Sequence, residues 1–151
     1  MEKEFIPHKE AKALKKLGFD EKCIAIYEGM EDKTFVAHYV THPYFTKEQL
    51  EDKKLRPALY ADQDTRNSKL PQWGISAPLY QQAFAWFRDE HNMLANVYSN
   101  ASGFLFEYHD TVGGTHRYDS DISGPNDSGC WDEYKDAELE CIKFLIKTVK
   151  K

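Results

Sequence analysis

Residues 132–150 read DEYKDAELECIKFLIKTVK and predict a closing amphipathic helix. Apolar residues recur there at helical spacing and form a wide stripe that can cover a core. Acids stand at its start and lysines at its end, where each sign is stabilised by the helix dipole. The stripe consists of Tyr134, Ala137, Cys141, Ile142, Leu145 and Val149. Such a helix needs a partner surface, which the rest of the chain must supply.

Other helices are predicted upstream of it. Pro7 suits a first turn and Gly18 a left-handed cap, so residues 7–17 predict a helix onto which Phe19 can pack back. Residues 46–54 begin with a capping-box pattern and predict a short second helix.

The sequence predicts a third upstream helix that starts after Ser76. Ser76 suits an N-cap, and apolar residues at helical spacing follow as far as His91. Trp86 and Phe87 of this helix are expected to lie in the hydrophobic core. The segment before it, residues 55–73, has no periodic pattern and predicts a long, partly ordered loop.

Five segments have the composition of β-strands. Two of them are expected to form a hairpin, and the other three follow the helix after Ser76. In chain order they are residues 23–27, 34–40, 94–99, 104–110 and 115–120. Gly113-Gly114 predicts a two-residue turn, which would set Asp110 opposite Arg117 and place His109 and His116 on one face.

The elements give the order α-β-β, long loop, α-β-β-β-α. This order predicts one α+β domain over residues 1–151, with helices packed on an antiparallel or mixed sheet. Residues 76–149 share their α-β-β-β-α order with double-stranded-RNA-binding domains. Those domains place lysines at the start of the last helix to grip phosphates, whereas this chain has Asp132, Glu133 and Asp136 there.

Composition excludes several classes of protein. With 41% hydrophobic and 14% aromatic residues in 151, the chain predicts a globular domain that folds without metal or disulfide. Its net charge is −5, with the acidic excess in the C-terminal half, which disfavours nucleic acid as a partner. No apolar run of membrane-spanning length and no signal peptide is visible, so a cytoplasmic protein is expected.

The three cysteines, Cys23, Cys130 and Cys141, have no CxxC spacing and predict free thiols in a reducing compartment. Cys23 and Cys141 lie on apolar faces and are expected to be buried. Cys130, next to Trp131 in an acidic loop, is expected to be the most exposed.

One acidic segment resembles part of a calcium-binding loop. Asp119, Asp121, Ser123 and Gly124 match four of its positions, and Asp127 a fifth. The bidentate glutamate that ends such a loop is replaced by Cys130. The sequence therefore predicts a polar loop before the closing helix, with no metal and no cofactor, although these aspartates are the candidate cation ligands.

No catalytic signature is present, so the candidate residues are binding residues. Aromatics in irregular segments are typical of contact surfaces. Together with the polar residues of the last predicted hairpin, the candidates are Tyr39, Tyr44, Phe45, Tyr60, Trp73, His109, His116 and Arg117.

Two stretches carry a resemblance, ISAPLYQQAFAWFR at residues 75–88 and YKDAELECIKFLI at residues 134–146. With Phe5-Ile6-Pro7 and LGFDE at residues 17–21, they resemble a group of small proteins encoded by phages and mobile elements of gut bacteria. The resemblance covers mainly the helices. It implies an origin, and so the cytoplasm of a bacterial host, and it assigns no catalytic residue.

Three functions stay open. The first is a non-enzymatic accessory protein that binds a host protein or small molecule, for example to antagonise defence signalling. The second is a metal-dependent hydrolase or nucleotide-processing enzyme that uses His109, His116, Asp110 or Asp119. The third is a protein that binds nucleic acid, or mimics it with an acidic face. A homo-oligomer is compatible with each of them.

Overall fold

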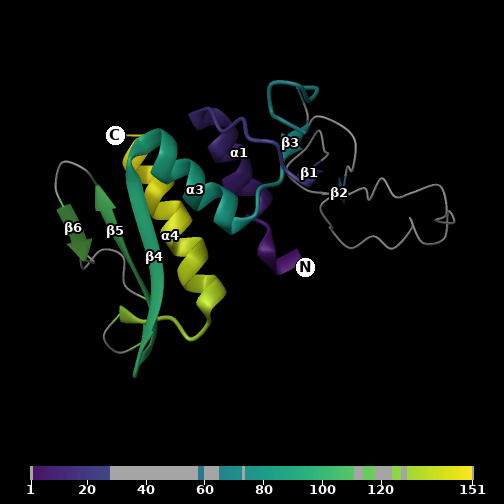
Figure 1. The fold of residues 1–151 in the computed structure, drawn as a ribbon. Helices are drawn as coiled ribbons and strands as arrows, with labels where there is room; N and C mark the ends of the chain where they lie inside the picture. The colour runs from purple at the N-terminus through teal and green to yellow at the C-terminus, as the bar shows by residue number, and fades with distance from the viewer. Residues whose placement is uncertain are drawn as a thin grey trace, which may run out of the picture. The chain divides into compact units, whose positions relative to one another are not determined.

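The computed structural model has an α+β fold, as predicted, with helices and two antiparallel three-stranded sheets. It describes residues 2–27, 58–59, 65–72, 74–110, 114–117, 124–126 and 129–150, and for residues 2, 58–59, 110 and 114–117 the backbone alone. The chain divides into two compact units, unit 1 from Met1 to Leu79 and unit 2 from Tyr80 to Lys151 (Figure 1). The expectation of one domain stays a prediction.

Unit 1 contains a helix and a small sheet. Its elements are the 3-10 turn η1 (Glu2–Glu4), α1 (His8–Leu17), β1 (Ala25–Tyr27), β2 (Ala58–Leu59) and β3 (Ile75–Ser76). Helix α1 ends as predicted, because Gly18 has a φ of 99° and Phe19 donates its N–H to the Leu14 carbonyl at 3.0 Å. Leu14 and Phe19 are both buried, so the cap also closes the apolar face of the helix.

The sheet of unit 1 has the order β2-β1-β3. Ile26 is opposite Ala58 on one side and Ser76 on the other. The predicted hairpin is therefore wrong at Ile26, since both sides of this residue are taken by strands that come later in the chain. Its predicted second strand, residues 34–40, and the predicted helix over 46–54 lie outside the described residues.

A polar network ties the segment 65–76 to the rest of unit 1. Thr65 is almost fully buried and accepts the N–H of Cys23 at 2.9 Å, while its own hydroxyl donates to the Cys23 carbonyl. Ser76 donates its hydroxyl to the Thr65 carbonyl at 2.5 Å. Asn67 adds a bond to the Phe19 carbonyl at 2.7 Å. Part of the predicted loop is thus held by specific hydrogen bonds.

Ser76 does not cap a helix. Its N–H is bound by the Asn67 side chain at 3.0 Å and its hydroxyl by Thr65, and it belongs to β3. Helix α3 (Tyr80–His91) begins four residues later. The predicted N-cap is wrong because these long-range bonds occupy the serine that local pattern assigned to the helix.

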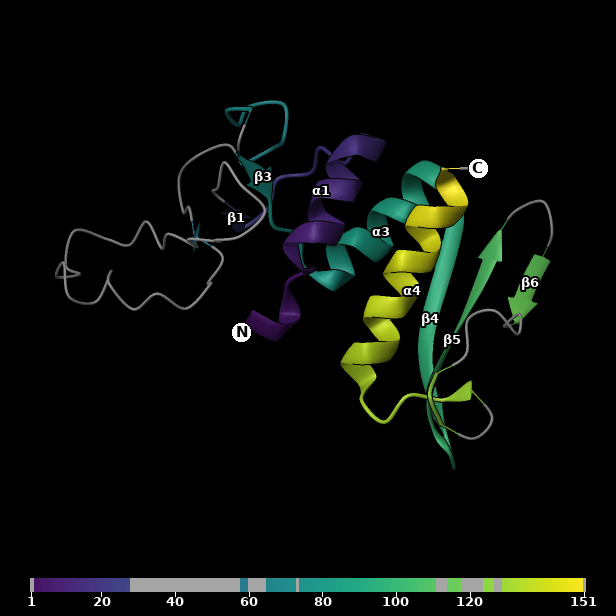
Figure 2. The same cartoon turned by 180° about the vertical axis from the view of Figure 1, so that it is seen from behind.

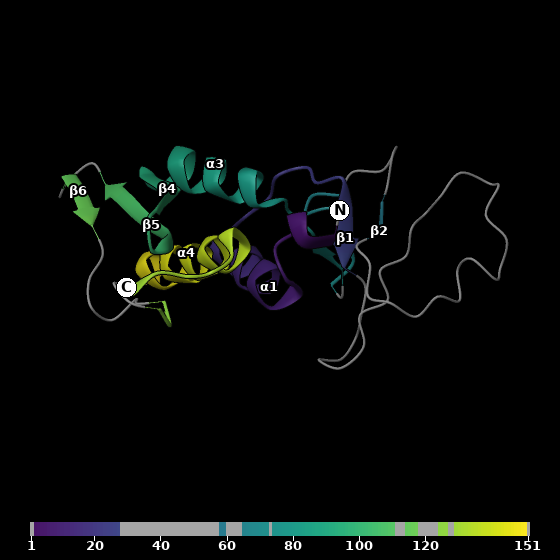
Figure 3. The ribbon, with the colours of Figure 1, turned by 90° about the horizontal axis from the view of Figure 1, so that it is seen from below.

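Unit 2 has the predicted α-β-β-β-α order. Helix α3 is followed by β4 (Met93–Asn100), β5 (Gly103–Asp110), β6 (Gly114–Arg117) and α4 (Tyr134–Val149). The strands form one antiparallel sheet in the order β4-β5-β6. Helix α4 packs against β4 and β5, and α3 packs against α4 and β4 (Figures 2 and 3).

The core of unit 2 lies between α4 and the sheet. Phe106 stacks on Trp131 with ring centroids 5.7 Å apart, and Tyr108 contacts Phe144 at 4.7 Å. The predicted core positions are confirmed for the residues of α4 and α3 with side chains at most 6% exposed, which are Ala137, Cys141, Ile142, Leu145, Trp86 and Phe87. Burial of these apolar side chains is the main force that holds the unit together.

The segment that leads into α4 is buried where exposure was expected. Cys130 is 0% exposed, and Trp131 is bridged to Phe104 of β5. Gly124 lies so close to Cys130 that a Cβ on Gly124 would meet the Cys130 carbonyl oxygen at 2.1 Å. The prediction of an exposed Cys130 is wrong, because the bridge joins the adjacent Trp131 to β5 and Gly124 packs closely against the Cys130 backbone.

In the part of the chain that the structure describes, no helix is long and apolar enough to cross a bilayer.

Candidate functional site

The candidate site is one face of the sheet in unit 2. Side chains alternate between the two faces of a strand, and Phe104, Phe106 and Tyr108 of β5 all contact the aromatic residues of α4 or its lead-in. We call the face that they share with Met93 and Val97 of β4 the inner face. The opposite, outer face holds the intervening residues.

The outer face is polar with exposed apolar groups. On β4 it carries Leu94, 50% exposed, Asn96, which is also exposed, and Tyr98, 38% exposed. On β5 it carries Glu107 and His109. Leu105 belongs to the same face but is buried, so the exposed part of β5 on this face consists of Glu107 and His109. An aromatic and a leucine exposed among polar groups are typical of a contact surface.

The register fixes how these residues are placed. Leu94 is opposite His109, and Asn96 is opposite Glu107. His109 Nε2 lies 3.7 Å from Glu107 Oε1, with 36% and 20% of the two side chains exposed. This separation allows an electrostatic contact between the two side chains when the imidazole is protonated. The face thus combines one titratable pair with the apolar groups of β4.

The predicted register of the last hairpin is wrong. Asp110 is opposite Gly114, and Arg117 is opposite Glu107, three positions away from the predicted pairing. Gly114 belongs to β6 and cannot form the centre of a two-residue turn. Because an odd shift exchanges the faces, position 109 belongs to the outer face and position 116 to the inner face. A metal or acid–base site built on His109 and His116 together loses its geometric basis.

The other predicted site residues lie outside the described residues. They are the binding candidates Tyr39, Tyr44, Phe45, Tyr60 and Trp73 and the candidate cation ligands Asp119, Asp121 and Asp127. For His116 and Arg117 only the backbone is described, so His109 is the candidate whose side chain can be placed.

A buried carboxylate was missed by the sequence pattern. Glu138 of α4 is 2% exposed and accepts a hydrogen bond from Lys135 Nζ at 2.8 Å. The Lys135 ammonium lies 5.1 Å from the centroid of the Tyr80 ring, a cation–π distance. Glu138 follows the apolar Ala137 in a run of acids, and only its i,i+3 spacing from Lys135 pointed to a pair.

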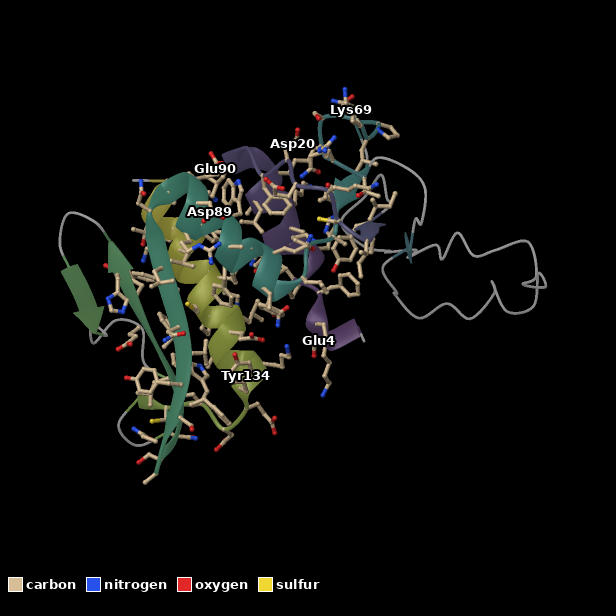
Figure 4. The ribbon with its side chains drawn as sticks, viewed as in Figure 1. Glu4, Asp20, Lys69, Asp89, Glu90 and Tyr134 are labelled. Carbon is tan, nitrogen blue, oxygen red and sulfur yellow. The ribbon has the colours of Figure 1, made fainter. Side chains whose placement is uncertain are left out.

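The start of α4 is acidic and exposed. Asp132, Glu133 and Asp136 are all exposed there, and Tyr134 is 41% exposed next to them (Figure 4). Anions are stabilised at this end of a helix by its dipole. The same charges would repel a phosphate backbone at this end of α4.

Two thiols, those of Cys23 and Cys141, and the phenol of Tyr27 are poor acids. Burial, aided by the charge of Glu21, raises the pKa of Cys23 to about 12, and burial next to Glu138 also raises the pKa of Cys141. Burial and Glu10 raise the pKa of Tyr27, whose hydroxyl donates to the Ile6 carbonyl at 2.6 Å. Thiolates are the reactive form of cysteine, so Cys23 and Cys141 act as small core residues near neutral pH.

No group of three or more potential metal ligands occurs within the described ranges of the chain. No protein-family model, curated protein or solved structure matches the sequence or the fold. The class that the structure defines is an α+β protein with an α-β-β-β-α unit whose sheet has an exposed outer face.

Proposed function

We propose that the chain is a small accessory protein that binds a protein of its bacterial host through the outer face of the β4-β5-β6 sheet. The observation that carries the proposal is the exposure of Leu94 and Tyr98 on a face that also holds Asn96, Glu107 and His109. Exposed apolar and aromatic groups within a polar surround provide the apolar centre and polar rim of a protein interface.

The extended form of this surface favours a protein over a small molecule as the ligand. Small molecules bind in concave sites that bury most of their surface, whereas a sheet face offers contacts spread over several strands. The resemblance to phage and mobile-element proteins supports a bacterial host as the source of the partner. Interference with a host pathway such as defence signalling is the form of this function that we favour.

A matched pair of substitutions tests the face. Leu94 and Ile24 are both 50% exposed, but Leu94 lies on the outer face and Ile24 lies next to β1 in unit 1. The full chain is immobilised, a host lysate is passed over it, and any captured protein is purified and titrated by calorimetry. We expect Leu94→Lys to weaken binding about tenfold or more, and Ile24→Lys to leave it within about twofold.

Equal affinity of wild type and Leu94→Lys for the captured protein would show that binding takes place elsewhere. Failure to capture any protein, together with a small molecule that co-purifies in native mass spectrometry, would replace the protein partner with a ligand. His109→Ala provides a second variant on the same face, which introduces no charge.

A further inference from the structure

Within the described residues, β4 is the edge strand of its sheet, and its sequence lacks the usual protection. Its sequence MLANVYSN contains no charged residue, no proline and no glycine. It pairs with β5 over eight consecutive positions, so no bulge interrupts it. Natural proteins protect exposed edges with charges, prolines, bulges or short strands, because an open edge is a template for another strand. An unprotected edge of this length therefore suggests a pairing partner.

The direction of the backbone groups of β4 follows from Phe104. Phe104 donates its N–H to the Trp131 carbonyl at 2.8 Å and accepts the Trp131 N–H at 2.9 Å, on the side of β5 away from β4. Successive residues of a strand direct these groups to opposite sides. Leu105 and Glu107 thus bond to Tyr98 and Asn96 of β4. The groups of the alternate β4 residues point to the free edge, and these residues are Ala95, Val97 and Ser99.

The free part of the edge begins after the first residues of the strand. Helix α3 leads into β4 and lies beside the Met93 end, and the strand continues well past it toward Asn100 (Figures 1 and 2). Among the described residues, the backbone groups of Ala95, Val97 and Ser99 have no hydrogen-bond partner outside the sheet. Within the described part of the chain, the edge donors and acceptors of these three residues are thus unpaired.

We propose that a second copy of this chain adds to the edge, with the two β4 strands antiparallel about a two-fold axis at Val97. In this register Val97 is opposite Val97 of the second copy, and Ala95 is opposite its Ser99. The outward groups then satisfy one another in about six backbone hydrogen bonds. The two sheets become one six-stranded sheet. This inference goes beyond the proposed function and does not depend on it.

The side chains of β4 suit pairing with themselves. The strand is uncharged, so no like charges oppose one another, although the chain as a whole carries −5. Odd-numbered residues of one β4 strand are opposite odd-numbered residues of the other, and even-numbered residues are opposite even-numbered ones. The outer faces of the two copies therefore lie on the same side of the joined sheet. Tyr98, 38% exposed in one copy, is placed over Asn96 of the other. The outer face is thereby doubled and made symmetric.

The first test uses one position and two substitutions. Ser99 is exposed, and its N–H points to the edge, so Ser99→Pro removes an edge donor that the single copy does not use. Ser99→Ala keeps the donor. In sedimentation velocity of the full chain, we expect wild type and Ser99→Ala at twice the 17.6 kDa of one chain, and folded Ser99→Pro at 17.6 kDa. A monomeric wild type, or a folded Ser99→Pro that stays dimeric, overturns the proposal.

The second test is independent of whether Ser99→Pro folds. Opposite residues of a hydrogen-bonded pair have Cα atoms about 5.5 Å apart, within disulfide range, whereas diagonal neighbours are about 7–8 Å apart. With oxidised glutathione, we expect Val97→Cys to form a covalent dimer and Asn96→Cys to remain a single chain, as does wild type with its buried cysteines. No cross-link at Val97, or an equal yield at Asn96, contradicts the pairing. The proposal is also contradicted if the chain is monomeric and a strand of another protein pairs with β4.

Discussion

Phe104 and Trp131 are joined by a pair of reciprocal backbone hydrogen bonds, of 2.8 and 2.9 Å, although 27 positions separate them in the chain. The bridge attaches the segment before α4 to β5 and places Trp131 over Phe106. It also brings the Trp131 backbone close to the start of β5. The entry of α4 into the core is therefore fixed by a contact with the sheet.

The bridge explains the glycine at position 103. Gly103 has a φ of 137°, and a Cβ there would meet the Trp131 carbonyl oxygen at 2.5 Å. We expect Gly103→Ala to lower the free energy of unfolding by about 3 kcal/mol, from backbone strain and overpacking together. Urea denaturation measures the loss. Gly18→Ala is the control, because Gly18 has a φ of 99° with nothing within 4 Å of a Cβ, and should cost only about 1 kcal/mol. Equal losses at the two positions would mean that the contact with Trp131 costs nothing.

The buried hydroxyl of Thr65 can be removed with little change in shape. Thr65→Val leaves the N–H and the carbonyl of Cys23 without their partner in a site that is 1% exposed. Unsatisfied buried polar groups are costly, so we expect a loss of about 2 kcal/mol in urea denaturation. Thr148→Val in α4 removes a partly buried bond to the Phe144 carbonyl and is expected to cost less than about 1 kcal/mol. A Thr65 variant as stable as wild type would show that water replaces the hydroxyl.

The ion pair between Lys135 and Glu138 should be asymmetric in its mutational cost. Lys135→Met leaves the Glu138 carboxylate buried without its positive charge, which we expect to destabilise unit 2 by about 3 kcal/mol. The double variant Lys135→Met/Glu138→Met removes both charges and should regain most of that loss. The comparison is made by thermal and urea unfolding at one pH. No recovery in the double variant would mean that packing of the two side chains, and not charge, determines stability.

Asp20 should make stability depend on pH in the acid range. Burial acts to raise the pKa of Asp20. Hydrogen bonds from Ser68 and the nearby charges of Arg66 and Lys69 outweigh it and lower the pKa (Figure 4). The Ser68 N–H donates to Asp20 Oδ1 at 2.6 Å. A carboxyl with a lowered folded pKa adds stability above its unfolded pKa of 3.8, and this stability is lost as pH falls through the folded value.

We therefore expect Asp20→Asn to be less stable than wild type at pH 7 and to approach it below about pH 4. The measurement is urea denaturation at a series of pH values. Glu90→Gln, at an exposed carboxylate on α3, serves as control for the loss of one charge. A constant difference between Asp20→Asn and wild type across the series would contradict the assignment.

Much of the fold could be predicted from local pattern. The cap at Gly18, the stripe of α4 and the strand order of unit 2 all follow from interactions among residues near one another in sequence. Such features depend on backbone conformational preference and on the period of apolar residues. The burial of Cys23 and Cys141 follows from the same periodicity.

Of the candidate site, the sequence predicted His109 as a binding residue and did not predict its neighbours. Leu94 and Asn96 were read only as parts of a strand. Their place on an exposed face with Glu107 depends on the pairing of β4 with β5. The prediction that His109 and His116 share a face is wrong because the register of the two strands is shifted by an odd number of residues. The amino-acid composition of the strands does not determine this register.

The sequence by itself determined α1, α4 and the body of α3, the order of strands in unit 2 and the acidic start of α4, because each depends on residues close to one another in the chain. Only the tertiary structure decided that Ser76 is a strand residue, that Cys130 and Glu138 are buried and that, within the described residues, β4 is the edge strand of its sheet. These features arise where distant segments compete for the same backbone groups or cover the same side chains. Hydrogen bonds of that kind depend on spatial proximity, which local pattern does not encode.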